Sequence, residues 1–143
     1  MESNHPIEFI TGEAPEVESF LSRQIERFNA RATGAEEAEA WSAVHRDRAG
    51  NIVAGASGFI WAGCGFVANL WVDESLRGQG IGRELMNLAE QHAGARRCHI
   101  IFLTTHDFQA PGFYRRCGYE EVARVVDLPP GHVDIHFAKR LGG

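Results

Sequence analysis

Three glycines stand at alternate positions in the segment ESLRGQGIGREL, directly before a run with helical periodicity. Gly78, Gly80 and Gly82 lack a Cβ, so successive backbone N–H groups there are free to converge on one anion. The amino-terminal end of a helix carries unpaired N–H donors and a partial positive charge, which together favour a phosphate. A tight turn needs only one such glycine, so the repeated glycines predict an anion site.

This loop differs from the two best-known nucleotide loops. A Walker A loop has a lysine and then serine or threonine after its last glycine, whereas Gly82 is followed by Arg83 and Glu84. The dinucleotide fingerprint GxGxxG is met only at Gly78 and Gly80, because Arg83 holds the place of the third glycine. The segment therefore predicts anion binding without the features of a Walker A or nicotinamide site.

Two further sets of residues have the chemistry of metal ligands. His132, Asp134 and His136 alternate along one expected strand, so their side chains share a face. That spacing suits a metal, but aspartate and histidine also commonly hydrogen-bond to each other, and we expect no metal. The three cysteines form no CxxC pair and are odd in number, which favours free thiols in a reducing compartment.

A single α/β fold must position these residues, because the 143-residue chain has no repeat or linker and is 44% hydrophobic. The periodicity predicts three helices, over 15–32, 81–94 and 107–117. It predicts seven strands, over 6–11, 41–47, 52–61, 65–73, 98–105, 120–128 and 132–140. The strand over 98–105 is apolar throughout, as in a strand covered on both faces.

Net charge and hydropathy limit the kinds of partner that the protein is expected to bind. The net charge of −5 argues against a nucleic-acid binder, and no apolar run approaches the roughly 20 residues that span a bilayer. The first residues are acidic where a signal peptide is basic, so we expect a soluble, cytoplasmic protein. Residues 75–119 nevertheless hold six arginines against three acidic residues. Solvated helix faces explain this excess, and so does a polyanionic ligand.

Two motifs carry a resemblance to a known family. RGQGIG, with Arg77, Gly80 and Gly82, resembles the [QR]xxGx[GA] motif of the GNAT N-acetyltransferase superfamily. About 30 residues on, DFQAPGFYRRCGYEEV is similar to the family's helix with Tyr, a basic pair and then Gly-Tyr. The resemblance implies one stand-alone domain over 1–143. Its mixed, mostly antiparallel sheet would have about seven strands, flanked by about four helices.

In GNAT proteins this loop holds the pyrophosphate of acetyl-CoA, so the resemblance implies acetyl-CoA as co-substrate. The implied loop contacts are Arg77, Gly78, Gln79, Gly80, Ile81, Gly82 and Arg83. Phosphate partners would be Arg77 with the pairs Arg96/Arg97 and Arg115/Arg116. The strand Leu70-Trp71-Val72 would lend backbone groups to the pantetheine and the thioester, with its side chains in the core. Asp107 stands where the family often has Asn, seven residues before the Tyr, and a pantetheine contact and a helix N-cap are both consistent with aspartate there.

The implied reaction is attack of a neutral amine on a thioester, which needs a proton acceptor for the ammonium and a donor for the thiolate. The resemblance assigns the donor role to Tyr114. The family's strand glutamate is missing, since the strand over 65–73 offers only Asn69 and Asp73. His106 follows the apolar strand and is our candidate base, although a surface histidine explains it equally well.

The acceptor is expected to be a small-molecule or peptide amine. His132, in the loop after LPPG, is the candidate contact to it. A catalytically silent acyl-CoA-binding or sensing module is the alternative function. GNAT proteins are often dimers, so a homodimer is an expected assembly.

Overall fold

The computed structural model describes residues 5–142, and the chain separates into two compact units, Met1–Glu37 and Ala38–Gly143. The first unit holds one helix, α1 (Pro15–Thr33), as the periodicity predicted. Pro15 lies in its first turn, and Gly34 ends it in the left-handed conformation, with its N–H donating to Ala30 O at 2.8 Å.

The prediction of a strand over residues 6–11 is wrong. These residues form no regular element, because a strand needs a neighbour for its N–H and C=O groups and residues 5–37, the described part of the first unit, offer none. Among the described residues the sheet therefore has six strands rather than seven. It is accompanied by three α-helices and a 3₁₀ turn rather than four helices.

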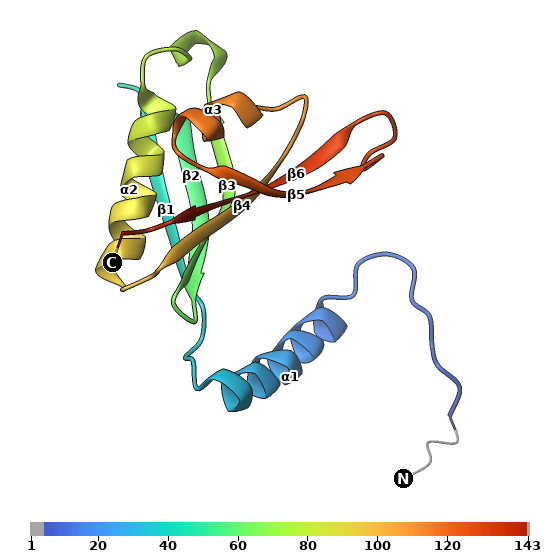
Figure 1. The fold of residues 1–143 in the computed structure, drawn as a ribbon. Coiled ribbons are helices and arrows are strands. Elements are labelled where there is room, and N and C mark those ends of the chain that lie inside the picture. Colours follow the sequence, from blue (N-terminus) through green and yellow to red (C-terminus); the bar gives the residue numbers. More distant parts are fainter. Residues whose placement is uncertain (1–4, 143) are drawn as a thin grey trace. The chain divides into compact units, whose positions relative to one another are not determined.

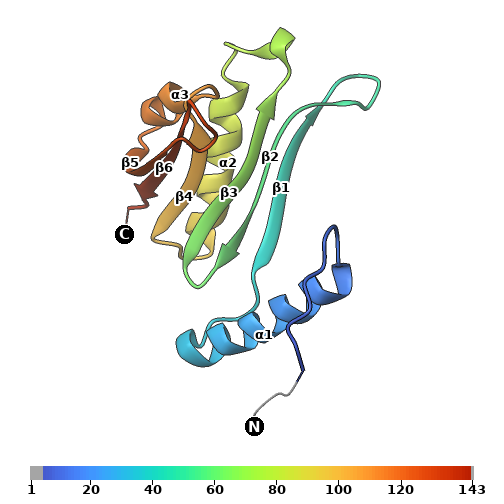
Figure 2. The ribbon, with the colours of Figure 1, turned by 90° about the vertical axis from the view of Figure 1, so that its right-hand side faces the viewer.

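The second unit is a mixed sheet with the strand order β1-β2-β3-β4-β6-β5 (Figures 1 and 2). All its neighbours pair antiparallel except β3 and β4. The strands are β1 (Glu39–Arg46), β2 (Ile52–Trp61), β3 (Cys64–Val72), β4 (Ile100–His106), β5 (Glu120–Val126) and β6 (Val133–Arg140). The helices are η1 (Glu74–Leu76), α2 (Ile81–Ala95) and α3 (Pro111–Arg116). No helix within residues 5–142 has both the length and the apolarity needed to cross a membrane.

Helices α2 and α3 share one face of this sheet and build its core with it. Phe137 on β6, Met86 on α2 and Ile101 on β4 are the largest fully buried side chains. Behind α3, Lys139 Nζ lies 2.6 Å from Glu90 Oε1 and donates to Cys117 O at 2.8 Å. These bonds join β6, α2 and the end of α3, so they fix the helix that carries Tyr114.

A bulge in β3 separates the two parallel strands. Ser57 pairs with Asn69 and Gly58 with Val67, so Ala68 has no partner on β2. Glycine is required at position 58, since a Cβ there would lie 1.8 Å from Phe66 O. The β3–β4 ladder covers only residues 64–66 and 100–102, so the two strands part before the bulge.

Candidate functional site

A cleft of about 870 Å³ lies where β3 and β4 part, a volume typical of a ligand site. Its walls come from the second half of β3, the loop into α2, the end of β4, and α3 with the residues before it. Because β3 has no ladder partner toward β4 beyond Phe66, its backbone polar groups on that side are available to a ligand.

The glycine loop is held by its own residues. The Asp73 carboxylate accepts hydrogen bonds from the N–H and hydroxyl of Ser75, and these bonds lower the pKa of Asp73. Arg77 Nε donates to Val72 O at 3.1 Å, and Gln79 Nε2 donates to Ser75 O at 3.4 Å. The loop is thereby positioned without using its glycine N–H groups.

The start of α2 presents a row of free donors, as the glycines predicted. Gly78 and Gly80 have φ of 77° and 85°, in the left-handed region, and Gly80 is the N-cap of α2. Within residues 5–142, the six consecutive N–H groups from Gly78 to Arg83 have no protein acceptor. The first paired amide is that of Glu84, which donates to Gly80 O at 3.0 Å. Such a row at a helix N-terminus is suited to a pyrophosphate.

Three arginines add positive charge to the cleft. Arg77, Arg83 and Arg116 line it, and Arg83 Nη2 donates to Arg116 O at 2.8 Å, which joins α2 to α3. The prediction that Arg96 and Arg97 serve the same ligand is wrong. They follow the far end of α2, about 20 Å from its first turn, and Arg96 Nη2 pairs there with Glu39 Oε1 at 2.7 Å.

Tyr114 reaches the cleft from α3. Its ring is buried and packs edge-on against Phe113 and Tyr119, with ring centres 5.2 and 6.1 Å away. Its hydroxyl has no hydrogen-bond partner among the described residues, although the side chain lines the cleft. Burial, with a smaller effect of Cys117, raises the pKa of Tyr114 to about 12. The phenol is therefore a protonated donor with no protein acceptor.

A cluster of histidines and aspartates lies beside the cleft, at the ends of β4 and β6. His106 Nε2 is 3.8 Å from Asp134 Oδ1, and the other oxygen of Asp134 is 3.0 Å from His136 Nε2. His132 Nδ1 is 3.2 Å from Asp107 Oδ1. Burial opposes the charge of Asp107, but hydrogen bonding by Val133 and the charge of His132 outweigh it and lower the pKa of Asp107. No cluster suited to a metal ion occurs among residues 5–142.

Phe108 links this cluster to the cleft. It lines the cleft, its ring stacks on that of His106 at 5.1 Å, and it meets His132 edge-on at 4.8 Å. The two histidines do not themselves line the cleft, so they lie at its edge, behind this half-exposed ring.

Most of the residues predicted for the site are brought together. Those that line the cleft are Leu70, Trp71, Val72, Arg77, Gly78, Gly80, Ile81, Gly82, Arg83 and Tyr114. Those that do not are Gln79, His106, Asp107 and His132.

Two finer expectations are wrong. The Trp71 side chain is 50% exposed rather than in the core, because residues after the bulge alternate so that Leu70 and Val72 point inward. Asp107 does not cap α3, whose N-cap is Ala110. The helix begins later than predicted, at Pro111, whose ring favours a first helical position.

Two polar contributors to the site, Thr105 and Gln109, were not predicted from the sequence. Thr105 is buried, lines the cleft, and donates to Gln109 Oε1 at 3.1 Å. For Asp134 the sequence left a metal site and a hydrogen bond to a histidine as alternatives, and the structure has the contact with His136. A threonine pair at the end of an apolar strand was the available signal for Thr105.

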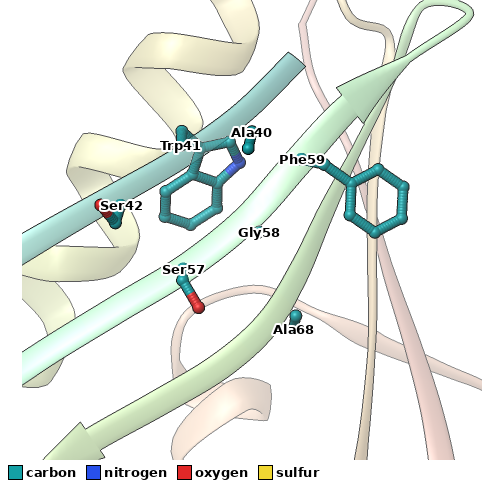
Figure 3. A pocket seen from close by; sticks show the side chains of 7 residues that line it. All are labelled: Ala40, Trp41, Ser42, Ser57, Gly58, Phe59 and Ala68. Carbon is teal, nitrogen blue, oxygen red and sulfur yellow. The ribbon is translucent and has the colours of Figure 1, made fainter. Parts of the chain in front are cut away.

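A second, shallow hollow of about 370 Å³ lies between β1, β2 and β3. Figure 3 shows the Trp41 ring beside Gly58, with Phe59 turned away from it. Ala68 lines both this hollow and the cleft. Since no ionisable side chain lines the hollow, we assign it no chemistry.

Residues 6–119 match the model of the Acetyltransferase (GNAT) family. A blasticidin-S acetyltransferase of Streptomyces morookaense is 44% identical over 73 residues, which are 50% of this chain and 54% of that protein. Acetyltransferase Atu2258 of Agrobacterium fabrum is 30% identical over 91 residues, 64% of this chain and 66% of that protein. The matches thus span about half to two thirds of these relatives.

The crystal structure of an acetyltransferase from Bacillus cereus aligns over 94% of this chain and 98% of its own, with a TM-score of 0.80 and 30% identity. The family takes its acetyl group from acetyl-CoA, whose pyrophosphate suits the free donors at the start of α2. By its motifs, its fold and the family match over residues 6–119, the chain belongs to the GNAT acetyltransferase family.

Proposed function

We propose that this chain transfers an acetyl group from acetyl-CoA to the amine of a small molecule. The observation that carries the proposal is the joint position of two groups in one cleft: the free N–H donors of Gly78 and of Gly80 to Arg83, and the unpartnered Tyr114 hydroxyl. The donors suit the pyrophosphate, and the hydroxyl suits the sulfur where the thioester breaks.

The reaction follows in one addition and one elimination. The amine nitrogen attacks the acetyl carbon, and the backbone N–H groups of Leu70 and Val72, which point away from β2, stabilise the oxygen as its negative charge develops. The C–S bond then breaks, Tyr114 donates a hydrogen bond and finally its proton to the CoA thiolate, and the tyrosinate regains a proton from solvent. Burial keeps the phenol neutral, so its hydroxyl can donate a hydrogen bond to the sulfur at any physiological pH.

A small-molecule acceptor is supported by the relative named blasticidin-S acetyltransferase. Asp107 and Asp134, at the edge of the cleft, favour a positively charged amine in its approach. We expect thiol release from acetyl-CoA in the presence of blasticidin S or another small cationic amine, measured with a thiol reagent over a panel that includes a peptide with a free amino terminus. Release with the peptide alone would contradict the small-molecule acceptor.

A silent acyl-CoA-binding module is the second candidate, because β3 offers no free base. Asn69 Nδ2 donates to Ser57 Oγ at 3.1 Å, and Asp73 is occupied in the turn that follows. This module would bind acetyl-CoA in calorimetry yet release no thiol with any amine of the panel.

We further propose His106 as the base that takes the ammonium proton, with His132 as a contact to the acceptor. His106→Gln retains the hydrogen-bonding capacity but removes titration near neutral pH, so we expect the acidic limb of the pH–rate profile to disappear. His132→Gln should raise KM for the acceptor and leave that limb in place. An unchanged limb in His106→Gln would mean that water or another group accepts the proton.

A further inference from the structure

His106 belongs to a line of three side chains on the sheet face opposite α2. His106 on β4 stands directly across from Asp134 on β6, and His136 follows two residues later on the same face of β6. Asp134 lies between the two imidazoles, 3.8 Å from His106 Nε2 and 3.0 Å from His136 Nε2. Its side chain is only 14% exposed, so its charge is weakly screened.

Gln109 acts on the other nitrogen of the same ring. Its Oε1 accepts the backbone N–H of His106 at 2.7 Å and the hydroxyl of Thr105 at 3.1 Å, and it lies 3.3 Å from His106 Nδ1. The His106 backbone N–H can only donate, so the Gln109 atom that it contacts must be the amide oxygen and not the amide nitrogen. The same oxygen atom is the one that lies near Nδ1. An amide oxygen only accepts, so this contact selects the tautomer with a proton on Nδ1 and a free lone pair on Nε2.

We propose that Gln109 and Asp134 are positioning residues for His106, an inference that rests on the proposed role of His106 as base. Gln109 holds the ring with Nε2 unprotonated. The proton then passes from the acceptor ammonium to Nε2, which leaves the amine lone pair free to attack. Asp134 stabilises the imidazolium so formed, and the proton later leaves Nε2 for solvent.

The charged groups around His106 within the second unit are few. Asp134 and, beyond it, His136 face it from β6. On the loop side the stacked Phe108 ring separates it from His132, which is paired with Asp107. Among the described residues, Asp134 is the one whose carboxylate lies within 4 Å of a His106 ring nitrogen, so it is the charge to remove in testing the effect on this ring.

The first test is Asp134→Asn, which keeps the shape and removes the charge. We expect the acidic limb of kcat/KM to move to lower pH, with kcat at neutral pH reduced on the order of 10-fold. His136→Gln is the matched control on the opposite side of the carboxylate. Without a second imidazole to share Asp134, that limb should move to higher pH. Shifts of opposite sign would support the proposal, because general loss of structure does not produce them.

Three outcomes would overturn it. If His106→Gln abolishes the acidic limb while Asp134→Asn does not shift it, His106 is still supported as the base, but Asp134 does not position it. If Asp134→Asn raises only KM for cationic acceptors, the carboxylate binds substrate. If His106→Gln leaves the limb unchanged, the proposed base fails, and this inference fails with it.

A spectroscopic test does not depend on enzymatic activity, and its first measurement uses the wild-type protein. Nitrogen NMR of the wild-type imidazoles should show neutral His106 with its proton on Nδ1, and Gln109→Leu should shift the proton toward Nε2. A wild-type ring protonated on Nε2 would overturn the role of Gln109.

Discussion

Replacing Tyr114 with Phe should lower turnover on the order of 10²-fold while acetyl-CoA affinity is largely kept. The substitution deletes one oxygen, whose interaction with the leaving sulfur is strongest as negative charge develops there. The hydroxyl has no protein partner among the described residues, so its loss leaves no buried group unsatisfied. The ring contacts with Phe113 and Tyr119 remain, and thermal stability should hardly change.

Tyr119→Phe is the matched control, because these two are the only tyrosines of the chain. Tyr119 is also buried, does not line the cleft, and donates to Glu90 Oε1 at 3.4 Å. Its loss should cost about 1 kcal/mol of stability and leave turnover intact. Wild-type turnover in Tyr114→Phe, with amine transfer shown to limit the rate, would remove Tyr114 from the mechanism.

The raised pKa of Tyr114 fixes the direction of two pH effects. With that pKa at about 12, the wild-type enzyme should show no loss of activity near pH 10 from ionisation of this phenol. Between roughly pH 10 and 12 the folded chain holds a proton that the unfolded chain has lost, so the free energy of unfolding falls as pH rises. Burial and Glu90 raise the pKa of Tyr119 as well, which adds to the same alkaline loss of stability.

The helices and strands of the second unit were mostly predicted from the sequence, because the residue pattern that indicates each one lies within that element. The glycine loop, the helix after it and the alternating strands depend on a few neighbouring residues, and each was placed to within a few residues. The strand over 6–11 failed because alternation of apolar residues cannot supply a pairing partner.

The finer parts of the site depend on distant residues. The exposure of Trp71 follows from a bulge that Gly58 permits on the neighbouring strand, and no pattern within the segment 65–73 encodes it. The His106–Asp134 contact likewise needs the register of β4 against β6, which places these two residues opposite each other although they are 28 positions apart in the chain. Both features depend on pairing between strands, which no single segment of the sequence encodes.

Replacing Gly80 with Val should weaken acetyl-CoA binding on the order of 10²-fold in calorimetry. At φ of 85° a β-branched residue is strained, and relief of that strain rotates the peptide groups whose N–H bonds would meet the pyrophosphate. The added side chain would also occupy the space in front of these donors. No protein atom lies within 4 Å of a Cβ at this position, so the protein itself does not exclude the side chain.

The control must carry the same strain away from the cleft. Gly63 has a φ of 76°, and a Cβ there would make only an ordinary contact with His99, at 3.8 Å. It lies at the opposite end of β3 from the loop, about 25 Å away along the strand. Gly63→Val should therefore lose a similar amount of stability and keep its affinity for acetyl-CoA. Equal losses of affinity in the two variants would point to general destabilisation, and a folded Gly80→Val with wild-type affinity would mean that the loop does not hold the cofactor.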